Sequence, residues 1–552
     1  MNSRGAVWAL AMMGTVAVAC AGGSSLNATP PSGDDGGGGG TFGDGGAMDC
    51  SATSTNYTGC PCVLGDHRSC YTGPPGTRDV GLCKDGTQTC VSTQNGEFQK
   101  GTYGDCQGET LPSPPVCDGL DHACNNTQNL CTDGGPQPQC SLAAPRLVAP
   151  LSTARATSRQ PNLRWELASG TDGVVVQLCK DRGCNSVLQT MPFKGASGTV
   201  PNDLPPGVVF WRAVSTMGTQ AIGCTLSPTW EFFVNARSAP VNTSWGTVLD
   251  VNGDGYADAA TVGVSGTVEV HLGSAGGLTG AAAAKLTVSA SRVANAGDVN
   301  GDGFGDLIVS DANSGGDVYL GGPNGIAPAP SSTATVPNES YSGFEPAGDV
   351  NGDGYADIIA SAGSATGYSP DVCVFHGGPS GLATAPSETL TAPEETHWVA
   401  GAGDVNGDQY ADVIVGTAGA HAGDGSQALD QAFVYHGSAS GLQVLPATTL
   451  TTPLVSYSEG ALVDCAGDVN GDGYADVLLS DEGQYGDYVD VFLGSSGGVA
   501  PTPSVTLTAP GSAQEDEFGS CMTALDVNGD GYWDVAVGEY SAGIHIFKSL
   551  MG

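Results

Sequence analysis

A nine-residue acidic segment recurs six times in the C-terminal part of the chain and constrains its fold more than any other feature. The first residues of successive copies lie 48 to 64 residues apart, a period that predicts a series of small β-sheets and not a helical solenoid. The copies are DVNGDGYAD at 250–258, DVNGDGFGD at 298–306, DVNGDGYAD at 349–357, DVNGDQYAD at 404–412, DVNGDGYAD at 468–476 and DVNGDGYWD at 526–534.

Each copy places oxygen-bearing side chains at alternate positions of a tight loop. Positions 1, 3, 5 and 9 are Asp, Asn, Asp and Asp, and the carbonyl of position 7 can add a fifth oxygen. A hard cation such as calcium takes six to eight oxygen ligands, with water supplying the rest. Glycine at position 6 permits a sharp turn that a Cβ disfavours. Gln409 replaces this glycine in the fourth copy, which we expect to be the weakest site.

These positions define the candidate metal ligands. Acidic turns that bind nothing are a poor alternative, because Asp-rich loops without a counter-ion would repel themselves. The predicted calcium ligands are Asp250, Asn252, Asp254, Tyr256 and Asp258; Asp298, Asn300, Asp302, Phe304 and Asp306; Asp349, Asn351, Asp353, Tyr355 and Asp357; Asp404, Asn406, Asp408, Tyr410 and Asp412; Asp468, Asn470, Asp472, Tyr474 and Asp476; and Asp526, Asn528, Asp530, Tyr532 and Asp534.

An EF-hand begins with the same residues, so this alternative must be weighed. An EF-hand needs an acidic residue at position 12 and a helix on each side of the loop. Short β-branched runs that suit buried strands follow the loops instead, and each repeat yields four short strands. Position 12 is never acidic: it is Thr261, Val309, Ala360, Val415, Leu479 or Val537.

This pattern resembles the FG-GAP/VCBS repeats of integrin α-subunit β-propellers and of many bacterial surface proteins. The resemblance implies an all-β, calcium-loop β-propeller over residues 237–552, in which each loop joins the first two strands of a blade and binds one calcium ion, about six in all. Six loops predict six blades, and seven stay open if one blade has lost its loop. Because the sixth repeat stops before its last strand, we hypothesise that residues 237–247 supply that strand and close the ring.

The charge of the chain is distributed very unevenly. The formal net charge is −40, and residues 240–552 hold 39 acidic side chains against the three basic ones of Lys285, Arg292 and Lys548. Nucleic acid is therefore excluded as a partner, because binding to backbone phosphates needs a basic patch. The excess negative charge must be solvated or matched by bound cations.

The N-terminus predicts export. Residues 1–20 place Arg4 before an apolar stretch that is too short to span a bilayer, as in a signal peptide. The sequence AVAC at 17–20 resembles the bacterial lipoprotein signal, which implies lipidation of Cys20 and anchoring to the membrane at the cell envelope, on the outer membrane or cell surface. Cleavage without lipidation stays open, because Ala17 stands where Leu is preferred. Residues 21–49 predict a Gly-rich, flexible tether.

Most of the cysteines fall in one short segment. Residues 50–140 hold eleven of the 18 and predict an exported, disulfide-rich module. The segment resembles Cys-rich modules of bacterial surface proteins described as metal-binding, but residues 117–126 lack two of the carboxylates expected there. We therefore expect these residues to form a disulfide loop. The alternative is a metal site in which His122 is a softer ligand. Cys465 and Cys521 precede the fifth and sixth loops. The sequence allows two alternatives for them, an interblade disulfide or two buried thiols.

Residues 141–236 change to short alternating strands. Trp165, the run VVVQLC at 174–179 and the run LPPGVVFWRAVS at 204–215 resemble a fibronectin type III or Ig-like sandwich, in which the early Trp fills the core. Cys179 and Cys184 flank a turn-like KDRG segment and predict a local disulfide. We expect this domain to act as a spacer.

Together these features predict a displayed surface protein. We expect the propeller to mediate adhesion or to bind an unknown surface glycan, matrix polymer or protein, and a purely structural envelope or matrix protein is the alternative. An enzyme is not expected, because the loop carboxylates are committed to calcium and His271, His376, His436 and His545 lie on Gly-closed strands. A propeller hydrolase would need paired carboxylates outside the loops, such as those of residues 515–517.

Overall fold

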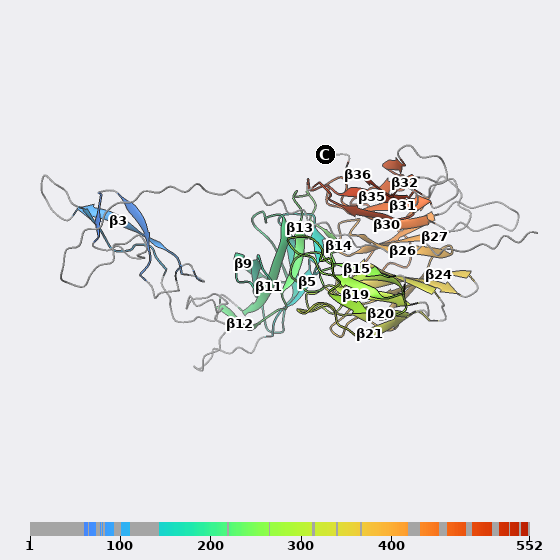
Figure 1. Cartoon of the computed structure of the whole chain (residues 1–552), viewed down its shortest axis with the longest axis horizontal. Helices are drawn as coiled ribbons and strands as arrows, with labels where there is room; N and C mark the ends of the chain where they lie inside the picture. Colours follow the sequence, from blue (N-terminus) through green and yellow to red (C-terminus); the bar gives the residue numbers. More distant parts are fainter. Residues whose placement is uncertain are drawn as a thin grey trace, which may run out of the picture.

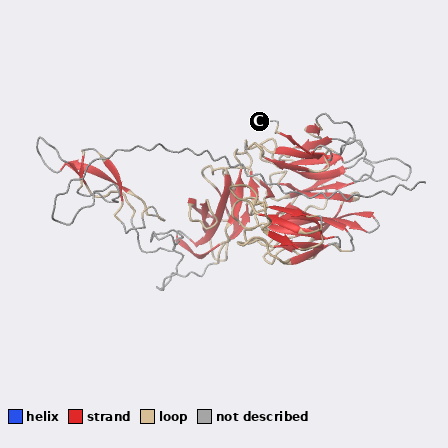
Figure 2. Cartoon of the chain, viewed as in Figure 1, coloured by secondary structure: helices blue, strands red, loops and turns tan. Residues whose placement is uncertain are grey.

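Every regular element that the computed structural model describes is a β-strand (Figures 1 and 2). In this part of the chain no helix offers an apolar stretch long enough to cross a membrane. The predicted signal peptide, Cys20, the tether and residues 117–126 and 515–517 lie outside the described residues. The structure describes residues 60–63, 66–72, 78, 80, 83–92, 101–110, 143–217, 220–263, 265–311, 315–337, 341–364, 367–417, 431–451, 461–481, 488–509, 518–528, 530–539 and 543–549.

The described part of the Cys-rich module is one small sheet held by disulfides. Its strands pair in the order β1-β4-β3-β2. Disulfides join Cys62 to Cys90 and Cys70 to Cys106, and Cys60 and Cys83 are disulfide-bonded as well. This confirms the predicted disulfide-rich character. The strands are β1 (Pro61–Cys62), β2 (His67–Cys70), β3 (Gly86–Ser92) and β4 (Gly101–Tyr103).

The next segment, residues 143–247, forms two sheets packed around one core, which we call the sandwich. The core is built on Trp165, Trp211 and Trp230, all buried. The predicted disulfide between Cys179 and Cys184 is present. One sheet has the order β10 (Ser197–Thr199), β7 (Asn162–Glu166), β5 (Arg146–Ala149), and the other has the order β14 (Ser244–Thr247), β6 (Ala154–Ala156), β13 (Trp230–Val234), β11 (Gly207–Met217), β8 (Gly173–Cys179), β9 (Val187–Lys194), with β12 (Gln220–Leu226) also paired to β11.

Six further antiparallel sheets follow, one for each nonapeptide, and we call them blades 1 to 6. Blades 2 to 5 have four strands in chain order, and blades 1 and 6 have three described strands each. The strands are β15 (Ala259–Val262), β16 (Val268–His271) and β17 (Ala284–Leu286); β18 (Ala290–Gly297), β19 (Asp306–Asp311), β20 (Gly315–Tyr319) and β21 (Ser332–Thr335); β22 (Tyr341–Gly348), β23 (Asp357–Ser364), β24 (Gly367–Phe375) and β25 (Glu388–Thr391); β26 (Thr396–Gly403), β27 (Asp412–Thr417), β28 (Gln431–Tyr435) and β29 (Thr448–Thr451); β30 (Ala461–Gly467), β31 (Asp476–Asp481), β32 (Tyr488–Phe492) and β33 (Val505–Thr508); and β34 (Met522–Leu525), β35 (Asp534–Glu539) and β36 (Gly543–Phe547).

Adjacent blades pack face to face through their central strands. Leu307 and Val309 on β19 pack against Val268 and Val270 on β16, so one face of blade 2 covers one face of blade 1. A strand buried on both faces reads as a continuous apolar, β-branched run, which is why the residues after each loop show no alternation of polar side chains. The result is a β-propeller, as the repeat predicts.

The residues before the first loop do not close the ring as we hypothesised. Strand β14 pairs with β6 of the sandwich, and β36 has only β35 as its partner among the described strands. Trp245 on β14 packs at the centre of the propeller, where its ring meets Trp533 edge-on with centroids 4.5 Å apart, in a cluster with residues of blades 4 to 6. A large aromatic side chain gains more by burial in this hub than at a blade edge, so the predicted role of residues 237–247 is wrong.

Blade 6 leaves one of its faces uncovered. Ile544 and Ile546 on β36 are 72% and 50% exposed. Val489 and Val491 hold the matching positions of β32 in blade 5, and they are only 0% and 4% exposed because blade 6 covers them. The described residues therefore supply no blade that covers this face, and the number of blades stays a prediction.

We expect replacement of Trp245 by alanine to lower the free energy of unfolding by about 3–5 kcal/mol, because it empties the hub where sandwich and propeller meet. Denaturant-induced unfolding of the full chain measures this. Leu445→Ala is the matched control, since Leu445 is 73% exposed and its truncation should change stability by less than about 0.5 kcal/mol. Equal effects of the two substitutions would contradict a central role for Trp245.

Candidate metal centres at the six loops

In blades 2 to 6 the nonapeptide forms a loop between the first two strands of the blade, and in blade 1 it precedes the first described strand, β15. Each loop is held by hydrogen bonds from its own amides to the Asp side chains at positions 1 and 9. In the first loop, the amides of Gly253 and Gly255 donate to Asp250 at 2.6 and 2.7 Å. The bond from the position 6 amide to the position 1 carboxylate recurs in all six loops at 2.7–2.9 Å. The bond from the position 2 amide to the position 9 carboxylate recurs at 2.8–3.1 Å.

The second oxygen of the position 9 carboxylate ties the loop to the end of another strand of the same blade, which is the third strand in blades 2 to 6 and β16 in blade 1. In blades 1 to 5 it accepts the amide of the glycine that closes this strand, at 2.7–2.9 Å, and in blade 6 the amide of Ser549 at 2.8 Å. A Cβ at one of these glycines, Gly321, would lie 2.3 Å from the carbonyl oxygen of Gly305. Close approach of two backbones therefore explains why this strand ends in glycine.

Ten of the twelve carboxylates at positions 1 and 9 are buried, and those of Asp349 and Asp526 are half-buried; burial opposes their negative charge. It raises the pKa of Asp258, Asp298 and Asp349 to about 7, and that of Asp404 and Asp468 to about 6. In the second to fifth loops burial also raises the pKa of the position 9 carboxyl well above its usual range. Accepted amide bonds only partly offset this effect. These loops thus concentrate negative charge that lacks a compensating positive charge.

The donor types fit calcium. Each loop offers three carboxylates, one amide oxygen and the carbonyl of position 7, all hard oxygen donors without nitrogen or sulfur. The carboxylates at positions 1 and 9 turn toward backbone amides, and over the described ranges no three acidic, His or Cys side chains gather closely enough to hold an ion. The loop residues therefore remain predicted ligands, and calcium would supply the missing positive charge between them.

The fourth loop keeps the shape of the others without its glycine. Gln409 has a φ of 75°, in the left-handed region, and the glycines at position 6 of the other loops have φ values between 84° and 96°. The amide of Gln409 donates to Asp404 at 2.9 Å as in the other loops. A side chain in this region strains the backbone, which supports the expectation of a weaker fourth site.

The sandwich covers the propeller face that carries the loops. It donates a hydrogen bond to a backbone carbonyl of every loop, at position 4, 5 or 6 and not at the predicted ligand carbonyl of position 7. The pairs are Arg182 Nε and Gly253 O (2.6 Å), Trp230 Nε1 and Gly301 O (3.1 Å), Arg182 Nη2 and Gly303 O (2.6 Å), Arg146 Nη1 and Asp353 O, Arg164 Nη2 and Gln409 O (3.1 Å), Thr243 Oγ1 and Gly473 O (2.5 Å), and Asn235 Nδ2 and Gly531 O (2.9 Å).

Arginines of the sandwich also lie over the aromatic rings at position 7. The guanidinium carbons of Arg237 and Arg182 are 4.0 and 4.3 Å from the ring centroids of Tyr532 and Phe304. Such cation–π contacts are typically worth about 0.5–2 kcal/mol each. No local motif predicts this interface, although the concentration of basic residues before the acidic repeats was a signal for it.

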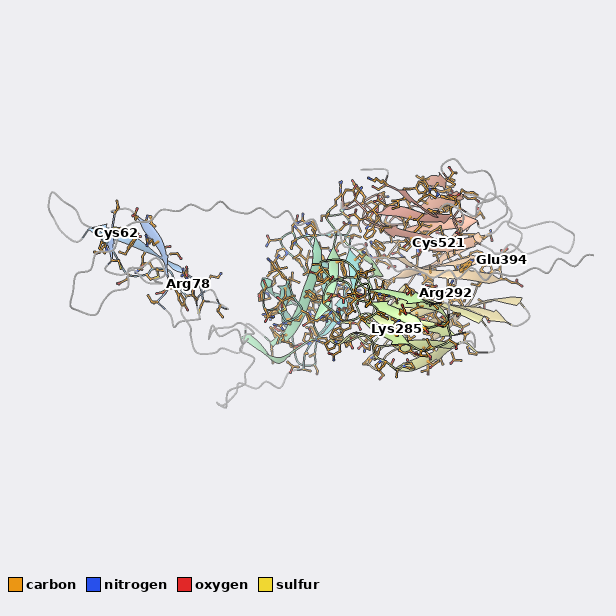
Figure 3. All side chains as sticks on the ribbon, in the orientation of Figure 1. Cys62, Arg78, Lys285, Arg292, Glu394 and Cys521 are labelled. Atoms are coloured by element: carbon orange, nitrogen blue, oxygen red, sulfur yellow. A yellow bond between two sulfur atoms is a disulfide. The ribbon has the colours of Figure 1, made fainter. Side chains whose placement is uncertain are left out.

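A cavity of about 660 Å³ lies along the propeller centre and is closed on one side by the sandwich. Glu345, Asp464, Cys465 and Cys521 are among its lining residues. Arg292 pairs with Glu345 at 2.9 Å. Arg292 and Cys521 are labelled in Figure 3. Cys465 donates to the carbonyl of Ala402 at 3.3 Å, and burial raises the pKa of this thiol to about 12. Cys465 is half-buried and Cys521 is exposed, so the alternative of two buried thiols is not what the structure shows.

Sequence comparison places these repeats in a known class. Residues 250–309, 298–360, 349–415 and 468–537 match the FG-GAP-like repeat family. This part of the chain is an integrin alpha-like β-propeller of FG-GAP repeats.

The relatives confirm the likeness over part of their length. The chain is 31% identical to integrin alpha-PS3 of Drosophila melanogaster over 154 residues, which is 26% of this chain and 14% of the relative. It is 35% identical to integrin alpha-IIb of Mus musculus over 103 residues, 17% of this chain and 10% of the relative. The crystal structure of BBS1N in complex with ARL6DN, soaked with lead, aligns with a TM-score of 0.35 and 14% identity over 55% of this chain and 81% of that chain.

We expect Gln409→Gly to raise the free energy of unfolding by about 1 kcal/mol, because glycine adopts the left-handed conformation without strain. Denaturant-induced unfolding at fixed calcium concentration measures this. Gly255→Gln is the reciprocal substitution: it introduces the same backbone strain, and its Cβ would also lie tightly against Phe210 at 3.2 Å, so it should destabilise by at least a similar amount. A neutral or destabilising Gln409→Gly would contradict the strain argument.

Proposed function

We propose that this is an exported protein of the bacterial cell surface whose propeller holds calcium in its six loops and binds a glycan, a matrix polymer or another protein. The integrin alpha-like FG-GAP repeats support adhesion or ligand binding. Anchoring through a lipidated Cys20, followed by the tether, the Cys-rich module and the sandwich, would hold the propeller away from the membrane.

The burial of the loop carboxylates is the observation that carries the calcium proposal. The blades offer little internal compensation for this charge: Lys285 pairs with Glu269 at 2.5 Å, and Arg292 pairs with Glu345 at 2.9 Å. The sandwich donors that reach the loops bind carbonyl oxygens and leave the position 1, 5 and 9 carboxylates to other partners. Divalent cations are the remaining source of positive charge for these sites.

The position of the sandwich bears on where a ligand can bind. Since the sandwich donates to all six loops, the loop face is occupied by a domain of the same chain. We therefore place the ligand at the opposite ends of the strands or on the outer edges of the blades. In a propeller, function resides in the loops of an accessible face and not in the fold itself.

Two alternatives have different support. A purely structural envelope or matrix protein would need the same calcium-stabilised blades without a ligand. A hydrolase would need paired carboxylates outside the loops. Glu345 and Asp464 both line the central cavity. Burial raises the pKa of Asp464, and the nearby charge of Glu345 raises it further. Glu345 is already paired with Arg292, which argues against a catalytic pair.

We expect calcium removal to lower the melting temperature of the full chain. Extracellular calcium modules typically have dissociation constants of about 0.1–1 mM, so each site at tenfold excess adds about 1.4 kcal/mol of stability. Calorimetry in calcium and in chelator measures this, with sodium chloride added to match ionic strength and exclude simple screening. Superimposable melting curves would remove calcium from the proposal.

We expect the folded full chain to bind members of a glycan and matrix-protein array in calcium, and to bind them less in chelator. Heat-unfolded protein on the same array is the control for nonspecific adsorption. Absence of binding in both conditions would contradict adhesion and favour the structural alternative.

A further inference from the structure

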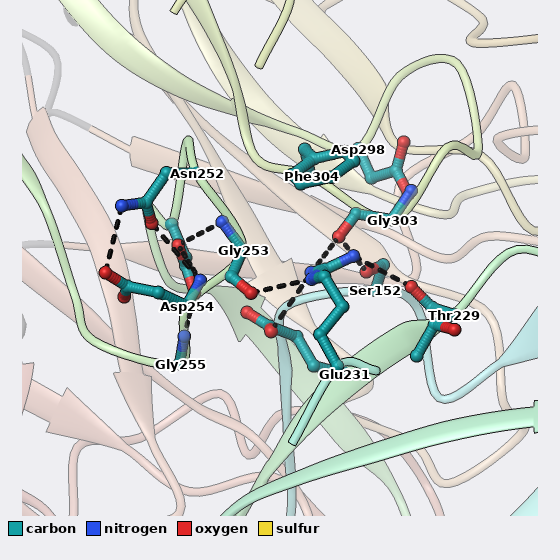
Figure 4. A network of polar contacts seen from close by, with 12 residues as sticks. Ser152, Thr229, Glu231, Asn252, Gly253, Asp254, Gly255, Asp298, Gly303 and Phe304 are labelled. Carbon is teal, nitrogen blue, oxygen red and sulfur yellow. Dashed lines mark hydrogen bonds and ion pairs between the residues drawn. The ribbon is translucent and has the colours of Figure 1, made fainter. Parts of the chain in front are cut away.

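Glu231 is a buried carboxylate at the interface between the sandwich and the first loop. It lies on β13, is 0% exposed, and accepts a hydrogen bond from Arg182 Nη2 at 3.1 Å through one oxygen, Oε2. The other N–H groups of Arg182 donate to the carbonyls of Gly253, Gly303 and Thr229 (Figure 4). One arginine thus serves both a carboxylate and the loop backbone, and it meets only one of the two oxygens of Glu231.

The second oxygen of Glu231, Oε1, has no donor among the described residues, although it is buried. The Glu231 carboxyl lies within hydrogen-bonding reach of the Asp250 carboxyl, the position 1 residue of the first loop. Asp250 already accepts the amides of Gly253 and Gly255. Two acidic groups that face each other in a site closed to water repel strongly unless a positive charge lies between them.

Glu231 differs from the other paired acidic residues of the sandwich. Glu166, Asp172 and Asp203 form ion pairs at the surface, with side chains about half exposed or more. Glu231 alone among them is fully buried, and its carboxyl, which has an unpartnered oxygen, lies beside that of a predicted metal ligand. Burial of a charged group without full compensation costs free energy. Glu231 therefore needs a positively charged partner, which a cation held by the first loop would supply.

We propose that Glu231 is a further ligand of the first loop's cation, so that this one ion is held jointly by the sandwich and the propeller. The proposal rests on the proposed binding of calcium in the loops. The first loop offers five protein oxygens, and calcium takes six to eight, so Glu231 would occupy a position that water fills in the other loops. An additional carboxylate raises affinity, which makes the first loop the tightest of the six sites.

Calcium titration of the full chain by calorimetry tests this, using wild type, Glu231→Gln and the control Asp172→Asn. We expect one tight site and a weaker class in wild type and in Asp172→Asn. Glu231→Gln keeps the shape of the side chain and should weaken the tight site about tenfold or more, in line with losses on altering metal-site residues. A Glu231→Gln isotherm that superimposes on that of wild type would overturn the proposal.

Anomalous diffraction from crystals of the full chain grown in calcium provides a second measurement that does not depend on the variant. An ion in the first loop within about 2.3–2.6 Å of Glu231 would establish the ligand. Ions in the loops without contact to Glu231 would overturn this inference and leave the proposed function intact, whereas the absence of ions from all loops would overturn both. A third outcome would also overturn the proposal. If Glu231→Gln is as stable as wild type in chelator, and calcium stabilises both proteins equally, Glu231 shares a proton with Asp250 and does not bind the ion.

Discussion

The rest of the structure depends on one interaction, the acceptance of backbone amides by a buried aspartate. In each loop the position 1 carboxylate accepts amides from the loop itself, and the position 9 carboxylate accepts one amide from the loop and another from the end of a later strand of the same blade. Because charge-assisted hydrogen bonds are about twice as strong as neutral ones, a short segment rich in glycine can hold a defined shape. The same bonds hold the loop against the start of the strand that follows it and the end of a second strand of the blade.

This inward orientation of the amides determines how the sandwich docks. When the N–H groups of a loop point at its carboxylates, carbonyl oxygens at positions 4 to 6 are left for other donors. Arginine has five donors in a fixed planar fork and cannot lose its charge in a protein, so it suits a surface that presents carbonyls beside negative charge. Arg182 uses this geometry on two neighbouring loops at once. The basic sandwich and the acidic propeller are thus complementary in hydrogen bonding as well as in charge.

Much of the fold could be predicted because its information is local. The positions of Asp, Asn and Gly in the nonapeptide, and the β-branched runs that follow, predict loop, strand and repeat without knowledge of the tertiary structure. The disulfide between Cys179 and Cys184 was predictable for the same reason. The role of Trp245 was not, since its partner Trp533 is 288 residues away in sequence and only the folded hub brings them together. The charge asymmetry signalled that the two halves attract, but it did not identify Arg182, Arg164 or Glu231 as the contacts.

The docking of the sandwich on all six loops has a mechanical consequence. If a pulling force acts between the N-terminal side of the chain and the far face of the propeller, it passes through the sandwich before it reaches the blades. The load is then shared by hydrogen bonds to every blade and by the Trp245 hub, and the peptide segment that enters the first loop does not carry it alone. Bonds loaded in parallel must break together, so this arrangement resists extension far better than two domains joined only by a linker.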